Sequence, residues 1–106
     1  LLKIDFSQKQ HIALNKMGHA AAVHQDKVYI LGGRNEIDLN DLFVYDPKER
    51  SWSEVEIAQR IPKPRRRHSA VFICSSLVMF GGFDSEFYND MYAMHLNAAA
   101  KSAVQV

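Results

Sequence analysis

Residues 28–52 read VYILGGRNEIDLNDLFVYDPKERSW, and the pattern of this stretch decides the fold. An apolar run ends in the pair Gly32-Gly33, a second apolar run follows, and Trp52 comes after a turn-like segment. The same pattern returns 49 residues later. The matched positions are Gly32-Gly33 and Gly81-Gly82, Asn40-Asp41 and Asn89-Asp90, His19 and His68, and Ala21 and Ala70. A fixed period of about 20–50 residues is the signature of a repeat protein, so we expect two units of one kind.

The composition of the 106-residue chain is that of a soluble globular protein, with 47% hydrophobic and 24% charged residues. The net charge of +1 gives no global attraction to nucleic acid or membranes, and no apolar run reaches the roughly 18 residues of a membrane helix. Cys74 is the only cysteine, which excludes an internal disulfide and a multi-cysteine zinc site. Because Cys74 lies in an apolar run, we expect a buried thiol in a reducing compartment, the cytoplasm or the nucleus.

The first unit is predicted to contain four strands. Residues 20–23 are rich in alanine and could be argued to form a helix, but Gly18 and the polar turn at 25–27 lie too close on either side. The matching residues 69–73 favour a strand, so we assign a strand to both segments. The other strands are expected at 27–31, where Gly32-Gly33 ends the strand and lets the chain leave the sheet, at 41–45 and at 51–57, with a loop at 34–39.

The second unit repeats this scheme after the connector Ile61-Pro62-Lys63-Pro64, which cannot be helical because each proline also restricts the residue before it. Its strands are expected at 68–73, 77–80 and 90–96, with a loop at 83–88. No fourth strand is recognisable. Residues 97–101 lack turn chemistry, and the repeat register places Lys101 in the position of Trp52.

The first residues resemble the end of a preceding unit. Residues 1–6 have the pattern of residues 42–47, an apolar strand closed by an aspartate. Residues 8–14 would then form a last strand, with His11 in the position of the tryptophan. The expected divisions are residues 1–14, the end of one unit, residues 15–63, a complete unit, and residues 64–106, a second unit without a recognisable fourth strand.

This pattern resembles the Kelch repeat. The first copy is carried by His19-Ala20-Ala21, Gly32-Gly33, residues 40–46 with Tyr45, and Trp52, and the second by Pro64-Arg65, His68-Ser69-Ala70, Gly81-Gly82 and residues 89–92. The resemblance implies an all-β fold in which each repeat forms one four-stranded antiparallel blade of a β-propeller. Because propellers close with about 4–8 blades, it also implies an incomplete propeller, to be closed by other blades of the same protein or by copies of the chain.

Three sets of residues have both a structural and a chemical interpretation. The resemblance gives Trp52 a packing role between neighbouring blades, with ligand stacking as the alternative. His19 and His68 would begin the innermost strands, where each could bond to an adjacent backbone or hold a metal. Asp41 and Asp90 could be paired carboxylates, but an Asn-Asp pair more often caps a loop. We therefore expect no enzyme, no metal site and no cofactor.

Basic residues crowd into Pro64-Arg65-Arg66-Arg67-His68-Ser69. This segment could be a nuclear localisation signal, a nucleic-acid contact, a kinase site at Ser69 or a loop on a partner-binding face. The resemblance favours the last, because Kelch substrate adaptors of ubiquitin ligases hold acidic peptides with arginines from the loops before the first strand and after the double glycine. The residues that match those loops are Arg34, Asn35, Arg65, Arg66 and Arg67. Arginine suits the task because its planar fork makes paired bonds to a carboxylate, although solvated arginines without a partner are the simpler alternative.

The expected function is a protein-interaction module, a substrate adaptor or a scaffold, that presents a basic loop rim to an acidic peptide or protein. Nucleic acid and membranes are not expected as partners. The alternative is part of a Kelch enzyme or cofactor-bearing propeller, of the oxidase, epimerase or specifier type, whose active site lies mostly outside this chain.

Overall fold

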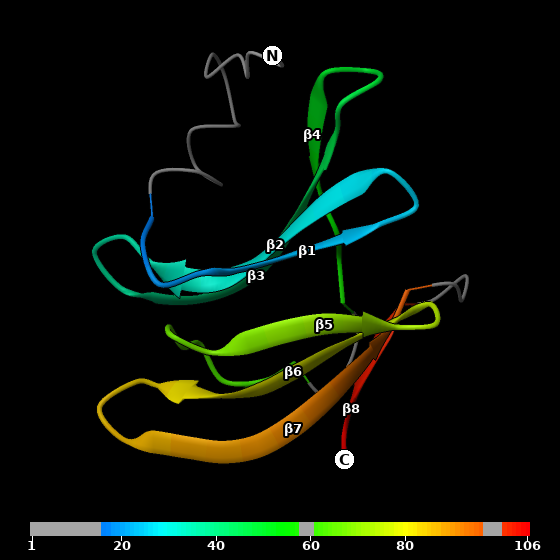
Figure 1. Cartoon of the computed structure of the whole chain (residues 1–106). Helices are drawn as coiled ribbons and strands as arrows, with labels where there is room; N and C mark the ends of the chain where they lie inside the picture. The colour runs from blue at the N-terminus through cyan, green and yellow to red at the C-terminus, as the bar shows by residue number, and fades with distance from the viewer. Residues whose placement is uncertain (1–15, 58–60, 97–100) are drawn as a thin grey trace.

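A computed structural model describes residues 16–57, 61–96 and 101–106. These residues form two four-stranded antiparallel sheets, one from each unit, which Figure 1 shows stacked with β1 beside β5. The first sheet consists of β1 (Ala20–His24), β2 (Lys27–Arg34), β3 (Asp38–Asp46) and β4 (Ser51–Glu54). The second consists of β5 (Ser69–Ile73), β6 (Ser76–Phe83), β7 (Phe87–His95) and β8 (Ser102–Gln105). The all-β fold and its four-stranded antiparallel sheets are therefore confirmed.

Each sheet is a meander in which every strand pairs with the next strand along the chain. β1 pairs with β2 from Ala20, opposite Leu31, to His24, opposite Lys27, so the alanine-rich segment is a strand and not a helix. No helix within the described ranges is long and apolar enough to cross a membrane.

The double glycine bends the second strand and does not end it, which corrects the sequence prediction. Gly32 and Gly33 have positive φ (63° and 98°), and the pairing of β2 with β3 shifts register between Leu31 and Gly33. Pairing then continues to Arg34, opposite Asp38. Gly81-Gly82 forms the same irregularity in β6. A β-bulge of this kind redirects a strand without breaking it, so the loop that follows is shorter than predicted.

The core of the molecule lies between the two sheets. Leu31 and Leu42 of the first sheet are buried against Leu77, Met79 and Met94 of the second. Period-two alternation along each strand places these side chains on the facing sides of the two sheets. The two units are therefore held together by a continuous apolar layer.

Trp52 lies on the face of the first sheet that points away from the second. It is paired with Tyr45 across β3 and β4, and the two rings are 4.9 Å apart at an angle of 45°. Trp52 therefore packs within its own sheet and takes no part in the core between the two described sheets. Its predicted packing against a neighbouring blade stays a prediction, because the residues interpreted as the end of a preceding unit, 1–14 with His11, lie outside the described residues.

The second unit has a fourth strand, so the prediction that it lacks one is wrong. β8 pairs with β7 from Tyr92, opposite Gln105, to His95, opposite Ser102. The connection before β8, residues 96–101, is two residues longer than the connection 47–50 before β4, and this difference breaks the repeat register. Ala103, opposite Met94, takes the position that Trp52 has opposite Tyr45. The tryptophan signal is missing because an alanine fills its position.

Cys74 is exposed, which corrects the expectation of a buried thiol. It lies at the turn between β5 and β6 with a φ of 54°. The apolar residues before Cys74 suggested burial, but Cys74 and Ser75 form the tight hairpin turn that joins the two strands.

Candidate functional site

The loops that join β2 to β3 and β6 to β7 lie at the same end of the two sheets, on the left of Figure 1. These loops, residues 35–37 and 84–86, together with Arg34 and residues 66–67 before β5, are called the loop rim below. The segment is fixed by the backbone: Arg66 N–H donates to the Phe83 carbonyl at 3.0 Å, and Phe83 N–H donates to the Arg66 carbonyl at 2.8 Å. Met17 and Arg34 exchange the same two bonds in the first unit.

Asp38, at the start of β3, ties the two units together at the loop rim. Its carboxylate accepts hydrogen bonds from Arg34 Nη1 at 3.1 Å and from Arg66 Nη1 at 2.9 and 3.1 Å. The Asp38 side chain is only 5% exposed, whereas Arg34 is 41% and Arg66 22% exposed. Two of the predicted arginines thus share one carboxylate, which fixes their positions and offsets part of their charge. Asp38 was not identified from the sequence.

Asp38 and Asp84 form a carboxyl pair across the loop rim. Burial opposes ionisation of Asp38, but the hydrogen bond with Asp84 and the charges of Arg66 and Arg34 outweigh it and hold the pKa of Asp38 below 3.8. The hydrogen bond to Asp38, followed by burial and the charge of Asp38, raises the pKa of Asp84 above 3.8. The two carboxyl groups therefore titrate as a coupled pair.

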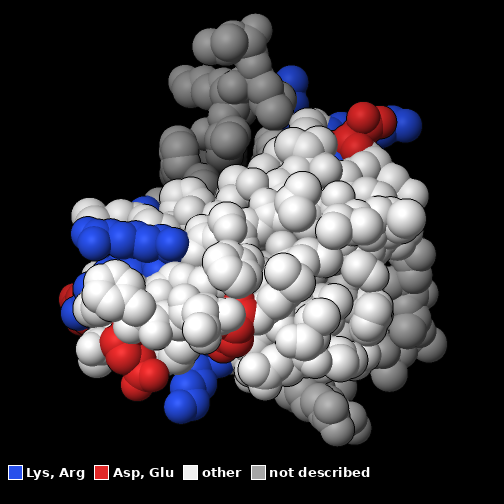
Figure 2. Space-filling view, turned by 60° about the horizontal axis from the view of Figure 1, so that its bottom comes forward, with Lys and Arg blue, Asp and Glu red and all other residues white. Residues whose placement is uncertain are grey.

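Aromatic side chains lie beside the arginines of the second unit. The Arg66 guanidinium is 4.9 Å from the centre of the Phe83 ring, and the rings of Phe83 and Phe87 are 4.9 Å apart. Phe87 is 86% exposed. Arg67 is also exposed, and within the described part of the chain it has no acidic partner; only its backbone is fixed, through a 2.7 Å bond to the Gly18 carbonyl. Figure 2 shows charged side chains of both signs gathered along this edge.

Arg65 lies inside the molecule, so a partner-facing role does not fit it. The side chain is 2% exposed and makes a bidentate ion pair with Asp90. It also donates to the carbonyls of Gly81 (3.0 Å) and Lys63 (3.1 Å), and its guanidinium lies 4.0 Å from the centre of the Tyr88 ring. Every side of the guanidinium is thus occupied, and Arg65 anchors the start of the second unit.

Lys16 has the same position in the first unit. It donates to Asp41 at 2.7 Å and to the Gly32 carbonyl at 2.9 Å, as Arg65 does to Asp90 and Gly81. Asp41 and Asp90 are therefore neither paired carboxylates nor simple loop caps: each holds a cation at the start of its own unit. The signal was present in the sequence, because Lys16 and Arg65 are separated by the repeat period of 49 residues.

Asn35 belongs to the turn of its own loop. Its side-chain carbonyl accepts from the backbone N–H groups of Glu36 and Ile37, an arrangement typical of an Asx-turn. The amide N–H₂ of Asn35 remains at the exposed surface of the loop rim. The structure thus brings Arg34, Asn35, Arg66 and Arg67 to one edge and removes Arg65 from it.

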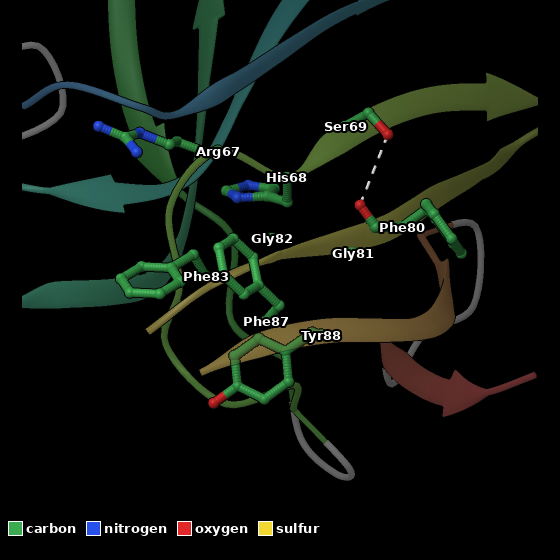
Figure 3. A pocket seen from close by; sticks show the side chains of 9 residues that line it. All are labelled: Arg67, His68, Ser69, Phe80, Gly81, Gly82, Phe83, Phe87 and Tyr88. Carbon is green, nitrogen blue, oxygen red and sulfur yellow. Dashed lines mark hydrogen bonds between the residues drawn. The ribbon is translucent and has the colours of Figure 1, made fainter. Parts of the chain in front are cut away.

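A cavity of about 310 Å³ opens beside the loop rim, on the side of the second sheet that faces away from the first. It lies over the bulge of β6, and Figure 3 shows Arg67 and the aromatic residues around it. Its lining residues include Arg67, Phe80, Gly81, Gly82 and Tyr88.

His68 bonds to the backbone of the neighbouring unit, which confirms the structural interpretation of this histidine. Its Nε2 lies 2.7 Å from the Leu31 carbonyl, and the ring is 7% exposed. Burial lowers the pKa of His68; the bond to Leu31 raises it, and the charge of Arg65 lowers it further. The neutral ring must therefore carry its proton on Nε2 in order to donate to the carbonyl. His19 is exposed, but partial desolvation of its ring and the charge of Lys16 lower its pKa as well.

Comparison with known families gives one match over nearly the whole chain. The family described as the KLHDC2/KLHL20/DRC7 Kelch-repeats domain matches residues 7–106. This range includes both sheets and the loop rim.

Individual proteins resemble the chain more distantly. It is 29% identical over 82 residues to the Leucine-zipper-like transcriptional regulator 1 homolog of Drosophila melanogaster, covering 76% of this chain and 8% of that protein. It is 34% identical over 74 residues to the tRNA wybutosine-synthesizing protein 2/3/4 of Oryza sativa, covering 67% and 7%. It is 29% identical over 84 residues to the Kelch domain-containing protein 3 of Bos taurus, covering 74% and 22%. The chain thus spans less than a quarter of these relatives. With two bulged four-stranded sheets and a family match across residues 7–106, the chain belongs to the Kelch-repeat family.

Proposed function

We propose that this chain is a protein-interaction module whose loop rim binds an acidic segment of a partner protein through Arg34, Arg66 and Arg67. The observation that carries the proposal is the shared carboxylate of Asp38, which holds Arg34 and Arg66 at one edge with fixed geometry. Kelch units are commonly used for protein binding, and the family membership agrees with this role.

The geometry explains how an acidic segment would be held. Arg34 uses only Nη1 on Asp38, and so does Arg66, so each guanidinium keeps further N–H groups for an incoming carboxylate. Arg67 adds an exposed charge beside them. The Phe83 ring under Arg66 and the exposed Phe87 offer an apolar surface next to the charges. The best ligand is therefore a peptide with carboxylates and an adjacent apolar side chain.

The loop rim is not a general anion site. Asp38 and Asp84 lie among the arginines, so a polyanion such as nucleic acid would meet two carboxylates as well. A short acidic segment can reach the arginines from one side and avoid this repulsion. We therefore propose a protein partner and no nucleic acid.

Binding to a panel of aspartate- and glutamate-rich peptides tests this proposal. Reversing two charges, Arg34→Glu with Arg67→Glu, should weaken the tightest peptide at least about tenfold, since each charge-assisted pair contributes on the order of 1 kcal/mol or more. Arg50→Glu is the matched control, because Arg50 is exposed and has positive φ like Arg67 but lies in the turn between β3 and β4. Equal binding by the double variant and the control would contradict the proposal, as would the absence of any binding peptide.

As to cellular role, we propose a non-enzymatic substrate adaptor or scaffold of the cytoplasm or nucleus. A ubiquitin-ligase adaptor is the specific form that an acidic-peptide site favours. A ubiquitin ligase should be recovered from cells together with the protein. The Arg34→Glu, Arg67→Glu variant should lose the substrate and keep the ligase.

A second candidate is a non-catalytic part of a multidomain enzyme. The similarity to the tRNA wybutosine-synthesizing protein 2/3/4 favours it, because that protein is named for a synthetic activity. On this proposal the present chain would position a substrate or a second domain, and the acidic-peptide panel would give no specific ligand.

A further inference from the structure

The loops that follow the bulged strands β2 and β6 are closed by the same backbone bond. Asn35 N–H donates to the Ile37 carbonyl at 3.2 Å, and Asp84 N–H donates to the Glu86 carbonyl at 3.0 Å. Asn35 and Asp84 are separated by the repeat period of 49 residues. Because Asn and Asp side chains both accept hydrogen bonds from the backbone of their own loop, the same side-chain contact is expected in both units.

The two side chains nevertheless bond to different groups. Asn35 Oδ1 accepts from the next two backbone N–H groups of its own loop. In the second unit, the described residues show no such bond to the Asp84 carboxyl, which is hydrogen-bonded to Asp38 of the first unit instead. The Asp84 side chain thus leaves its own loop and reaches across the boundary between the two units.

The backbone of the second loop differs from that of the first at its middle residue. Ser85 has a φ of 64°, in the left-handed region, whereas the matching residue, Glu36, does not have a positive φ. A left-handed conformation is unfavourable for a residue that carries a side chain. The loop with the capping Asn35 is therefore the relaxed form of this turn, and the loop with Asp84 turned toward the first unit is the strained form.

The position of the Asp84 carboxylate makes the central group of the loop rim neutral. Asp38 accepts hydrogen bonds from Arg34 at 3.1 Å and from Arg66 at 2.9 and 3.1 Å. The charges of the same two arginines also act on Asp84. Two guanidinium groups thus face two carboxylates. An acidic partner gains little from this group while both carboxylates stay in place, because the attraction and the repulsion offset each other.

The two carboxylates are held unequally. The Asp38 side chain is 5% exposed and bonds to both arginines. Asp84 is half-buried on the loop, and within the described residues it forms no ion pair with either arginine. Its hydrogen bond to Asp38 raises its pKa, so the ionised form of Asp84 is disfavoured in this position. Asp84 is therefore the carboxylate that can be displaced, while Asp38 stays with the arginines.

We propose that Asp84 is a displaceable carboxylate that controls the access of acidic partners to Arg34 and Arg66. This inference rests on the proposed function of the loop rim. Without a partner, Asp84 lies toward Asp38 and repels an approaching carboxylate. When a carboxylate of the partner binds the two arginines, Asp84 turns back onto the N–H groups of its own loop, as the matching Asn35 side chain does, and the loop relaxes.

The displacement makes the loop rim selective for segments with two neighbouring carboxylates. A segment with one carboxylate only replaces the charge that it displaces, so its net gain is small. A second carboxylate can also bind Arg67, which is exposed and has no acidic partner in the part of the chain that the structure describes. The expected partner is therefore a segment with at least two adjacent aspartate or glutamate residues.

Neutralising Asp84 in the full chain tests the proposal against a matched control. The probe is the tightest peptide of the aspartate- and glutamate-rich panel. Asp84→Asn should bind it at least about fivefold more tightly, because a like charge leaves the arginines. Glu86→Gln removes the same charge from an exposed position of the same loop and should change the affinity by less than about twofold. Equal gains in the two variants would overturn the proposal, since only the net charge would then matter.

The same peptides report the selectivity. The parent protein should prefer peptides with two neighbouring carboxylates to peptides with one, and this preference should shrink in Asp84→Asn. A preference that is the same in both proteins would contradict the selective role of Asp84.

A variant without a change of charge tests the movement of the loop. Ser85→Gly removes the cost of the left-handed backbone, so it favours the unbound form and should weaken the probe peptide by about two- to fivefold. A purely electrostatic role of Asp84 predicts no change. Unchanged or tighter binding by Ser85→Gly would therefore contradict the displacement.

Two outcomes separate the inference from the proposed function on which it rests. If neither the parent protein nor Asp84→Asn binds any peptide of the panel, the proposed function fails and the inference fails with it. If the parent protein binds a peptide and Asp84→Asn binds it no more tightly, only the displacement of Asp84 is wrong. The loss expected from Arg34→Glu with Arg67→Glu would then still stand.

Discussion

The two units of this chain have the same architecture but fill its matched positions with different residues. Lys16 stands where Arg65 stands, Trp52 where Ala103 stands, and each sheet is nevertheless a four-stranded meander with a glycine bulge in its second strand. The repeat therefore requires certain contacts at each position but not one residue type. A cation must reach an aspartate and a glycine carbonyl, and the length of its side chain can vary.

The two units also differ in what covers the bulge in their second strands. The bulge glycine of the first unit lies under the His68 ring, whereas an added Cβ at the bulge glycine of the second unit, Gly81, would meet only the Tyr88 carbonyl oxygen, at 3.4 Å. Within the described residues, the same local sequence is therefore packed against a histidine ring in one unit and not in the other. The difference in exposure between matched residues therefore depends on the segments packed against each sheet and less on the strands themselves.

The largest effect is expected from the buried cations. Arg65→Ala should lower the free energy of unfolding by about 3–5 kcal/mol, because it leaves Asp90 without its partner and two carbonyls without a donor. Lys16→Ala should cost less, about 2–3 kcal/mol, since Lys16 makes one ion pair and one carbonyl bond. Denaturant unfolding measures both. Lys48→Ala, in the exposed turn before β4, is the control and should change stability by less than about 0.5 kcal/mol. An equal loss of unfolding free energy in all three variants would contradict the anchoring role of Arg65 and Lys16.

The tryptophan position should give the next largest effect. Trp52→Ala is expected to cost about 2–4 kcal/mol, because it removes the ring that packs on Tyr45. The reverse change in the other unit, Ala103→Trp, should not stabilise the protein. Ala103 is 1% exposed between the sheets, so the larger ring would overfill the core and cost about 1–3 kcal/mol. Thermal unfolding of the two variants checks this, and a raised melting temperature for Ala103→Trp would refute it.

The smallest effect is expected from the two histidines on acidification. Burial holds the pKa of His68 below its ordinary 6.5, so the unfolded chain binds the proton more readily than the folded chain. The stability due to the neutral ring is therefore complete above pH 6.5 and declines as the pH falls through that value. Between about pH 7.5 and 5.5, the loss of unfolding free energy should be smaller in His68→Gln than in the parent protein.

His19 provides the comparison for this measurement. It is exposed where His68 is buried, so His19→Gln should change the pH dependence less than His68→Gln. Identical pH profiles for the parent and His68→Gln would show that the buried ring does not govern the response to acid.

Much of this fold could be predicted from the sequence because the pattern occurs twice. The strands around Tyr45 and Tyr92 are marked by apolar residues that recur in one register. β8 escaped prediction for a physical reason: a connection two residues longer shifts the register, and Ala103 has no bulky side chain to mark its position. The exposure of Cys74 escaped prediction because the turn residues Cys74 and Ser75 are not those typical of a hairpin turn.

The candidate site was only partly predictable. The sequence predicted that Arg34 follows the double glycine and that Arg66 and Arg67 precede the first strand of the second unit. The structure brings these two segments to one edge. It could not separate Arg65 from them, since a run of three arginines does not reveal which side chain turns inward. Asp38 was missed because its role depends on a contact between two units that only the packed sheets create.

The most direct test of the claim that one geometry serves both units is an exchange of the anchoring cations. In the double variant Lys16→Arg, Arg65→Lys, each unit keeps a cation that can reach its aspartate and its glycine carbonyl. The free energy of unfolding should then lie within about 1.5 kcal/mol of that of the parent protein, with the difference reflecting the lost fork geometry at Asp90. A loss as large as that of Arg65→Ala would contradict it, because the two positions would then not be equivalent.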